Sequence, residues 1–357
     1  MKAFVTGSTG LLGSNLVNLL LDQGHEVMAL ARSPQKAREV LGESPRLTVL
    51  KGDMEDVAAF AGHLRGQEVL FHVAAYFRDY FGSGDHWPML EKINVNGTMQ
   101  LLDQAEAAGI RKVIYVSSSG VIGTDAAGTD AAGTESGGVV NEDTPPGKMQ
   151  QSNLYFKSKV IAEQRLLEWL KTHSLPVVQI LPTWIWGPGD AAPTAAGQLV
   201  LDFLNRKLPG IVEGSSTIVD ARDVAQAMIA AVDTGRSGER YLIANQRVTL
   251  AEILRGLEKV SGVPGPRTYI PFRLALLVAF FSETAARLRG TTTLITIEGI
   301  RTLQDHADYS ADKARRELGH RPRPLEETLR DSVNWYLLHQ LEKIANPSVQ
   351  KPVRVMA

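Results

Sequence analysis

The first half of the chain alternates short apolar runs with segments whose apolar residues recur at helical spacing. One such segment, residues 97–110, reads GTMQLLDQAEAAGI and follows the period of an amphipathic helix. Apolar strands that alternate with helices are typical of a parallel sheet covered on both faces. We therefore predict an α/β fold, a doubly wound parallel sheet of the Rossmann type. The predicted strands lie within residues 2–7, 25–31, 46–52, 68–75, 112–119 and 176–184.

From about Trp186 the pattern changes to mostly helical segments punctuated by Pro and Gly. We expect a dinucleotide-binding domain over residues 1–185, a smaller, mostly helical substrate-binding lobe over 186–340 and a loosely held tail over 341–357. The lobe is expected to be discontinuous, because residues 216–245 again have the pattern of a helix with flanking strands and should return to the first domain.

Residues 123–138, GTDAAGTDAAGTESGG, repeat a five-residue unit of small and polar residues. Such a segment buries too little apolar surface to offset the entropy of ordering, so we predict a loop. A substrate lid and a tolerated insertion are both compatible with this pattern.

Composition and charge exclude several classes of function. The formal net charge is -1 and the chain has no cysteine, so nucleic-acid binding, disulfides and thiol chemistry are not expected. The eight histidines are scattered without metal-ligand spacing, and no metal is expected. The start of the chain has no signal-peptide pattern, and the apolar run Leu274 to Phe281 is too short to span a bilayer. We expect a soluble cytoplasmic protein.

Three glycines, Gly7, Gly10 and Gly13, follow the first predicted strand and open a helix. Glycines let a backbone turn tightly and approach a pyrophosphate, and a helix N-terminus offers unpaired N–H groups to it. The turn therefore predicts a dinucleotide site, with Ser8 and Thr9 as possible hydroxyl donors. Further cofactor contacts are expected from Leu11, Leu12, Met54, Ala74, Ala75, Tyr155, Lys159, Pro182 and Thr183.

The end of the second strand indicates which cofactor binds. An NAD site usually has an acidic residue there for the ribose 2′-hydroxyl, whereas this chain has Arg32, followed by Ser33 and Lys36. A guanidinium pairs well with a 2′-phosphate, so NADP(H) is favoured over NAD(H), the alternative being a solvated basic turn. Asp53, after the third strand, is expected to accept a hydrogen bond from the adenine amino group.

Tyr155 and Lys159 stand four residues apart in a predicted helix and therefore share one face. A phenol titrates near about pH 10, so a neighbouring cation is needed to favour phenolate near neutral pH. Lys159 can supply that charge and hold the nicotinamide ribose. Three serines close the fifth strand, at the sheet edge where ligands bind, and a serine there can orient a substrate carbonyl.

Together these motifs resemble the extended short-chain dehydrogenases/reductases, over nearly the whole length, from TGSTGLLG through YFKSK and PTWIWGPGD to GERYLIAN and LEETLRDSVNWY. The resemblance implies a catalytic Ser, Tyr and Lys with a supporting Asn. These fall on Tyr155, Lys159 and Asn94 of INVNGT. Counting back from Gly123 selects Ser118 as the serine, whereas counting from the strand end allows Ser119.

Within this family, PTWIWGP resembles the dihydroflavonol-reductase-like branch, and HVAAYFRDY resembles bacterial hopanoid-associated sugar epimerases. Nucleotide-sugar epimerases often carry an asparagine where this chain has Thr183 and Trp184. We therefore expect reversible, NADPH-dependent reduction of an aldehyde or ketone, with Tyr155 as proton donor, Ser118 orienting the carbonyl and Lys159 tuning the phenol. The alternatives are an NAD-dependent nucleotide-sugar epimerase or dehydratase and a nucleotide-sensing regulator without chemistry.

Substrate contacts are expected from loops beyond the strand ends: Tyr76, Arg78, Tyr80, Ser119, Trp184 and Trp186. Packing between the lobes is the alternative for the tryptophans, and a surface ion pair is the alternative for Arg78. Residues 271–289 predict an amphipathic helix, either buried or lining the pocket, or resting on a membrane. By resemblance alone, a homodimer through the helices at 97–108 and 155–170 is expected.

Overall fold

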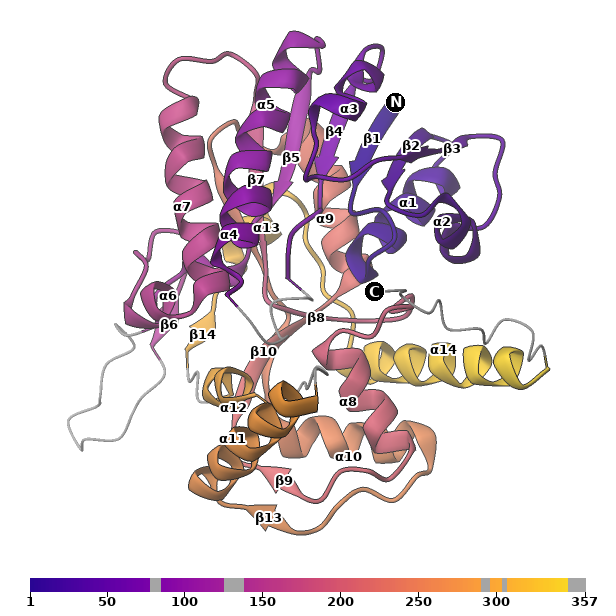
Figure 1. Ribbon diagram of the computed structural model, residues 1–357, viewed down its shortest axis with the longest axis vertical. Coiled ribbons are helices and arrows are strands. Elements are labelled where there is room, and N and C mark those ends of the chain that lie inside the picture. Colours follow the sequence, from indigo (N-terminus) through magenta and orange to yellow (C-terminus); the bar gives the residue numbers. More distant parts are fainter. Residues whose placement is uncertain (78–84, 125–137, 290–295, 304–306, 346–357) are drawn as a thin grey trace.

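A seven-stranded parallel sheet forms the centre of the computed structural model, which describes residues 1–77, 85–124, 138–289, 296–303 and 307–345 (Figure 1). The strand order, β11-β7-β5-β4-β1-β2-β3, confirms the predicted doubly wound sheet. The strands are β1 (Lys2–Thr6), β2 (Glu26–Ala31), β3 (Leu47–Lys51), β4 (Val69–His72), β5 (Lys112–Val116), β7 (Val177–Pro182) and β11 (Arg240–Ile243).

Two layers of helices cover the sheet, each over its own apolar cluster, as expected for strands that are buried on both faces. One layer comprises α1 (Leu11–Asp22), α2 (Pro34–Leu41), α9 (Ala221–Thr234) and α13 (Asp312–Glu317). The other comprises α3 (Ala58–Ala61), η1 (Gly62–Leu64), α4 (Trp87–Leu90), the π-helix η3 (Glu91–Gly97), α5 (Thr98–Ala107) and α7 (Leu154–Trp169).

The second lobe lies below the sheet in Figure 1 and has its own apolar core around Trp186. Its helices are α8 (Ala195–Leu204), α10 (Leu250–Ser261), α11 (Phe272–Arg289), α12 (Ile297–Thr302) and α14 (Leu325–Ala345). Its strands are β8 (Trp184–Trp186), β9 (Ile211–Val212), β10 (Ser215–Asp220), β12 (Gln246–Thr249) and β13 (Tyr269–Ile270). Short elements near the strand ends of the first lobe are η4 (Ser119–Val121), β6 (Val139–Val140), α6 (Lys148–Ser152) and β14 (Asp308–Tyr309).

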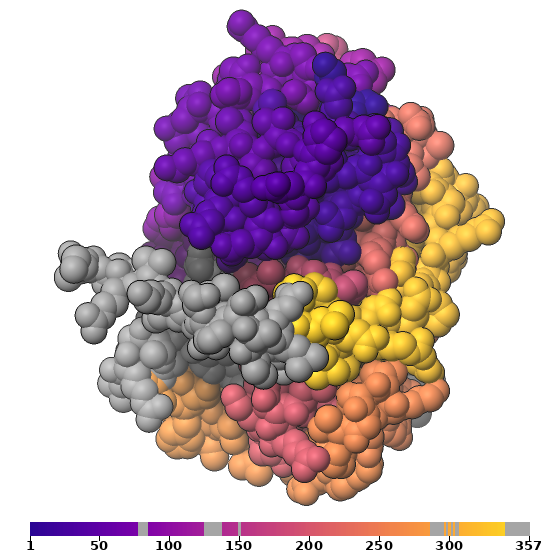
Figure 2. All heavy atoms as spheres, turned by 90° about the vertical axis from the view of Figure 1, so that its right-hand side faces the viewer, coloured from indigo at the N-terminus to yellow at the C-terminus, as the bar shows by residue number. Residues whose placement is uncertain are grey.

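The chain crosses between the lobes more than once. Residues within 216–245 return to the first lobe as α9 and β11, and α13 at 312–317 also packs on the first sheet. The expected tail at 341–357 begins inside α14, which extends to Ala345. In Figure 2 the yellow atoms of this C-terminal part lie alongside both lobes.

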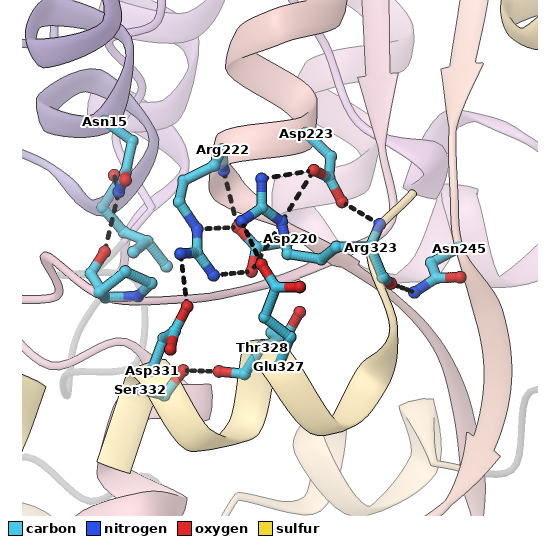
Figure 3. A network of polar contacts seen from close by, with 12 residues as sticks. Asn15, Asp220, Arg222, Asp223, Asn245, Arg323, Glu327, Thr328, Asp331 and Ser332 are labelled. Atoms are coloured by element: carbon cyan, nitrogen blue, oxygen red, sulfur yellow. Dashed lines mark hydrogen bonds and ion pairs between the residues drawn. The ribbon is translucent and has the colours of Figure 1, made fainter. Parts of the chain in front are cut away.

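An ion-pair network joins the lobes (Figure 3). Asp220 and Asp223, at the start of α9, are buried, and each pairs with an arginine. Arg222 binds Asp220 through two nitrogens and reaches Asp331 of α14 at 2.6 Å. Arg323, just before α14, donates to Asp223 from its side chain and its backbone N–H, each at 2.8 Å. The relative position of the two lobes is therefore fixed partly by charge.

Helix α11 is only partly buried. Like every other described helix, it is not long and apolar enough to cross a bilayer. Ala275 and Ala279 face the lobe, while Leu274, Leu277, Val278, Phe280 and Phe281 are exposed. The interpretation of this helix as one that rests on a membrane stays a prediction.

Candidate active site

The glycine turn has a backbone that tolerates no side chain at two of its three glycines. Gly7 has a φ of +67°, and a Cβ there would lie 2.7 Å from the backbone nitrogen of Ala74. A Cβ on Gly13 would lie 2.0 Å from the carbonyl oxygen of Gly7. Gly10 caps α1 without any side-chain hydrogen bond, and the first turn of α1 holds no acidic residue. The turn therefore presents bare N–H groups and the positive end of a helix dipole, which suits a pyrophosphate.

Hydroxyl groups anchor this turn to the sheet. The Thr6 hydroxyl oxygen accepts the N–H groups of Val73 and Ala74, which joins the ends of β1 and β4. The buried Ser8 hydroxyl donates to the Leu30 carbonyl at 2.8 Å. The prediction that Ser8 offers its hydroxyl to a phosphate is therefore wrong in this structure, because that proton satisfies a buried carbonyl of β2. Thr9 is half-buried in the turn.

The end of β2 carries the predicted basic group. Arg32 is exposed, and its guanidinium has no hydrogen bond or ion pair with any residue the structure describes. Ser33 caps α2 by accepting the Lys36 N–H, so Ser33 shapes the turn while the Lys36 side chain stays exposed. Asp53 lies half-buried beyond β3 and accepts the Glu55 N–H with one carboxylate oxygen. Two cations and one carboxylate thus border the sheet edge next to the turn.

The other residues predicted to contact the cofactor differ in how far they are buried. Leu11, Leu12, Met54 and Pro182 are buried, so their side chains support the edge from inside. Ala74 and Ala75 are half-buried beyond β4, where small side chains leave room. Thr183 donates its hydroxyl to the Ile243 carbonyl at 3.4 Å, a long bond between the ends of β7 and β11.

Helix α7 carries Tyr155 and Lys159 at its N-terminal end. The Asn153 side chain caps this helix by accepting the Phe156 N–H at 3.0 Å. Tyr155 therefore stands in the first turn and Lys159 one turn further, on the same face. The Lys159 ammonium donates to the Val116 carbonyl at the end of β5, at 3.0 Å, and only 2% of the residue is exposed.

Burial changes the pKa of both groups. It lowers the pKa of Lys159 to about 7, and it raises the pKa of Tyr155 above its usual value. Desolvation is the cause of the raised pKa of Tyr155, so its phenol is protonated at neutral pH, and the tuning of this phenol by Lys159 stays a prediction. Lys159 titrates close to neutrality.

Asn94 lies in the π-helix η3 and joins three segments of the site. Its carboxamide oxygen accepts the Tyr76 N–H at 2.7 Å. Its amide nitrogen donates to the Tyr76 carbonyl and to the Ser158 hydroxyl, both at 3.1 Å. The Ser158 hydroxyl donates in turn to the Tyr155 carbonyl at 2.7 Å. In this structure Asn94 therefore ties the loop after β4 to the first turn of α7.

The serine-rich end of β5 packs directly against α7. Ser118 caps η4 by accepting the Gly120 N–H with its hydroxyl oxygen at 3.0 Å, and Ser119 is the first residue of η4. Both are half-buried, so the choice between Ser118 and Ser119 stays a prediction. Gly120 lies against the Phe156 ring, where a Cβ would come within 2.2 Å of the ring.

The structure places the predicted substrate-binding residues in different surroundings. Arg78 and Tyr80 lie outside the described residues. The Tyr76 hydroxyl is hydrogen-bonded to His86 at 2.9 Å. Trp186 is only 1% exposed in the core of the second lobe, so its assignment to substrate binding is wrong: lobe packing holds its indole. Trp184 is half-buried, edge-on to Trp186, with ring centroids 5.0 Å apart.

One aromatic residue of the site was not predicted. The Phe77 ring meets the Tyr155 ring edge-on, with centroids 4.7 Å apart. The sequence prediction takes residues 76, 78 and 80 of AAYFRDY and omits the phenylalanine between the first two. The position of Phe77 directly after Tyr76 was the available signal. Because β4 ends at His72, the side chains of residues 76–80 do not alternate between two faces as they would in a strand.

Comparison with known proteins adds a family. The sequence model of the NAD dependent epimerase/dehydratase family matches residues 3–244. A putative dihydroflavonol 4-reductase of Synechocystis is 31% identical over 94% of this chain and 94% of its own. Sterol demethylase protein B of Methylococcus capsulatus is 32% identical over 94% and 98%. The 2-alkyl-3-oxoalkanoate reductase of Stenotrophomonas maltophilia is 30% identical over 92% and 98%.

Solved structures agree with the fold. The protein gox2253 is 32% identical and superposes with a TM-score of 0.75 over 94% of this chain and 98% of its own. Two structures at lower identity show the fold alone. UDP-glucuronic acid 4-epimerase of Bacillus cereus, in complex with NAD, is 20% identical with a TM-score of 0.72, over 95% of this chain and 99% of its own. The yeast methylglyoxal/isovaleraldehyde reductase Gre2, complexed with NADPH, is 22% identical with a TM-score of 0.71, also over 95% and 99%.

Proposed function

Because the chain belongs to the NAD dependent epimerase/dehydratase family and is an NAD(P)-dependent oxidoreductase, we propose that it reduces an aldehyde or ketone to an alcohol with NADPH. The observation that supports the proposal is the protonated phenol of Tyr155, which is half-buried in the first turn of α7, one turn from Lys159 and edge-on to Phe77. Burial raises the pKa of Tyr155, so at neutral pH this group holds a proton that it can donate. Reduction of a carbonyl needs a proton donor, whereas oxidation of an alcohol needs the base.

The residues divide the reaction between them. When bound, a reduced nicotinamide supplies a hydride to the carbonyl carbon. Tyr155 donates its phenolic proton to the carbonyl oxygen, which becomes the alcohol. Ser118 orients that oxygen, with Ser119 as the alternative donor. Lys159 holds the nicotinamide ribose, and Asn94 fixes the start of α7 through Ser158.

Cofactor choice rests on Arg32. Its exposed guanidinium, free of contacts with the described residues, is available to pair with a 2′-phosphate. Lys36 adds a second positive charge close by in sequence, and Asp53 is available to the adenine amino group. We therefore favour NADP(H) over NAD(H).

An apolar carbonyl compound fits the surroundings of Tyr155. Phe77 contacts the phenol, and half-buried Trp184 lies beyond the end of β7. The similar reductase of Stenotrophomonas is named for a 2-alkyl-3-oxoalkanoate, a substrate with apolar chains. We place apolar aldehydes and ketones first among substrates on these grounds.

The test measures the rate of NADPH oxidation by its absorbance, with each compound of a panel of aldehydes, ketones and sugar nucleotides. It compares the wild type with Tyr155→Phe. Loss of a general acid lowers turnover by roughly 10²- to 10⁴-fold. NADPH binding, followed by fluorescence, should weaken by no more than about tenfold, because the variant removes at most one hydrogen bond to the cofactor and leaves the other predicted contacts in place. Wild-type turnover by Tyr155→Phe would refute the assignment.

The alternative reaction, a nucleotide-sugar epimerisation or dehydration, keeps NAD bound and regenerates it in each cycle. It predicts NAD in the purified protein and conversion of a sugar nucleotide without net loss of NADPH. Steady consumption of NADPH with simple ketones is expected from our proposal and would exclude this alternative as the main reaction.

A further inference from the structure

A row of polar residues crosses the central sheet from strand to strand. Register pairs Thr6 of β1 with His72 of β4, His72 with Tyr115 of β5, Tyr115 with Gln179 of β7, and Gln179 with Arg240 of β11. Register partners on neighbouring strands point to the same face of a sheet. Here that face is covered by α5 and α7. Polar side chains in a doubly covered sheet are costly unless they are bonded, so this row needs a physical explanation.

One end of the row is a directed chain of hydrogen bonds. Because Thr6 accepts two N–H groups, its own proton is available to His72 Nδ1, 2.9 Å away. His72 Nε2 lies 3.0 Å from the Thr98 hydroxyl, which donates to the Asn94 carbonyl at 2.8 Å. This order requires a neutral imidazole that carries its proton on Nε2. The chain links the glycine turn to the helix that holds Asn94.

The middle of the row lies against Lys159. The Tyr115 ring stacks on the His72 imidazole, with centroids 5.5 Å apart, and the Lys159 ammonium lies 5.2 Å from the Tyr115 ring centroid. The ammonium makes one hydrogen bond with the described residues, to the Val116 carbonyl. A desolvated ammonium that lies over an aromatic face is stabilised by the quadrupole of the ring.

Among the described residues, no carboxylate forms an ion pair with Lys159. Glu163 stands one turn further along α7 and is bound to Arg240 at 2.7 Å, at the other end of the row. The remaining titratable groups around Lys159 are Tyr155 on its own helix and His72 on β4, which burial keeps uncharged. The ring of Tyr115 is therefore the second group, beside the Val116 carbonyl, that holds the ammonium.

We propose that Tyr115 is a positioning residue, whose ring holds the Lys159 ammonium at the end of β5 and, by stacking on His72, places it beside the hydrogen-bonded end of the row. The inference rests on the proposed function for the role of Lys159 in the reaction. The phenolic hydroxyl is not part of it: Tyr115 Oη is buried and has no hydrogen-bond partner among the described residues. The aromatic face alone acts on Lys159.

The unpaired hydroxyl provides a matched pair of variants. Tyr115→Phe keeps the ring and removes a buried hydroxyl without a partner, so it should fold at least as stably as wild type. Tyr115→Leu removes the ring face. Tyr115→Met is the second ring-free variant, which fills the space with a flexible chain should the leucine protein fold poorly.

The first readout is the pH dependence of kcat/KM with NADPH and the best carbonyl of the panel. The ring favours the ammonium, so its loss lowers the pKa of Lys159 from about 7 by about one pH unit. The limb of the profile that belongs to Lys159 then moves to lower pH. At pH 7 the protonated fraction falls about fivefold, and kcat/KM falls with it, whereas Tyr115→Phe keeps the wild-type profile.

The second readout does not depend on turnover. Protein labelled with ¹³C at lysine Cε is titrated by NMR, and Lys159→Met identifies the Lys159 signal. We expect the Lys159 midpoint to fall in Tyr115→Leu and Tyr115→Met and to stay in place in Tyr115→Phe. Equal midpoints in all four proteins would overturn the inference. A shifted midpoint in a protein that reduces no carbonyl would uphold the role of Tyr115 and count against the proposed function.

Discussion

At the scale of single residues, the prediction that NADP(H) is favoured depends mainly on Arg32. Its guanidinium is exposed and makes no hydrogen bond or ion pair with the described residues, so it is available to a phosphate. The same property makes it a clean target, because its removal disturbs no observed hydrogen bond.

We predict that Arg32→Asp weakens NADPH at least about tenfold relative to NADH, since a charge-assisted hydrogen bond is lost and a repulsive carboxylate is gained. Dissociation constants of both nucleotides, measured by fluorescence titration, give the ratio. Arg38→Asp, an equally exposed change at the far end of α2, is the control and should leave the ratio alone. An unchanged ratio in Arg32→Asp would mean that Arg32 does not select the cofactor.

At the scale of elements, the site depends on where α7 begins. Asn153 caps the helix, Asn94 reaches it through Ser158, and Gly120 of η4 packs under the Phe156 ring. These three contacts position the first turn of α7, which carries Tyr155.

We expect Gly120→Ala to shift the start of α7, because the added Cβ would lie 2.2 Å from the Phe156 ring. Overpacking of this kind costs about 1–3 kcal/mol. Turnover should fall as well, since a displacement of about 1 Å can cost about 10²-fold. Gly62→Ala is the control: it has helical backbone angles and open space around it, and should be neutral or slightly stabilising. Thermal unfolding and kcat are measured on both, and parallel behaviour of the two variants would contradict this account.

At the scale of the whole molecule, a buried ion-pair network holds the lobes together (Figure 3). Asp223 is 2% exposed, and both of its oxygens accept from Arg323. Such a carboxylate depends on its partner, because a buried charge without one is costly.

Arg323→Met should therefore destabilise the protein by about 3–5 kcal/mol, the usual cost of breaking a buried pair. Arg315→Met, which breaks an exposed pair with Asp312, should cost no more than about 1 kcal/mol. Denaturant unfolding of both proteins checks the difference. Asp223→Asn combined with Arg323→Met should recover part of the loss, and equal costs for the two single variants would show that the network is not structural.

Three expectations about the whole molecule stay predictions. The homodimer through α5 and α7, the domain boundaries and the role of the repeat at 123–138 are untested, and residues 125–137 of that repeat lie outside the described part of the chain. Three other expectations are confirmed: the family, the Rossmann-like sheet and the NAD(P)-dependent oxidoreductase activity.

Local pattern was enough for the sheet, the glycine turn and the pairing of Tyr155 with Lys159. Strand and helix periods, the φ of +67° at Gly7 and a spacing of four residues on one helix are all properties of short segments. A family resemblance supplied Asn94, whose hydrogen bonds to Tyr76 and Ser158 join segments far apart in the chain.

Tertiary structure alone decided which hydroxyls were already bonded, which tryptophan was buried and what lay beside Lys159. Ser8 bonds to Leu30, Trp186 packs in the second lobe and Phe77 meets Tyr155, none of which follows from spacing. The polar row from Thr6 to Arg240 is invisible in the sequence, because its members come from five strands and meet only through register. Desolvation, which sets the pKa values of Tyr155 and Lys159, likewise depends on every segment that covers them.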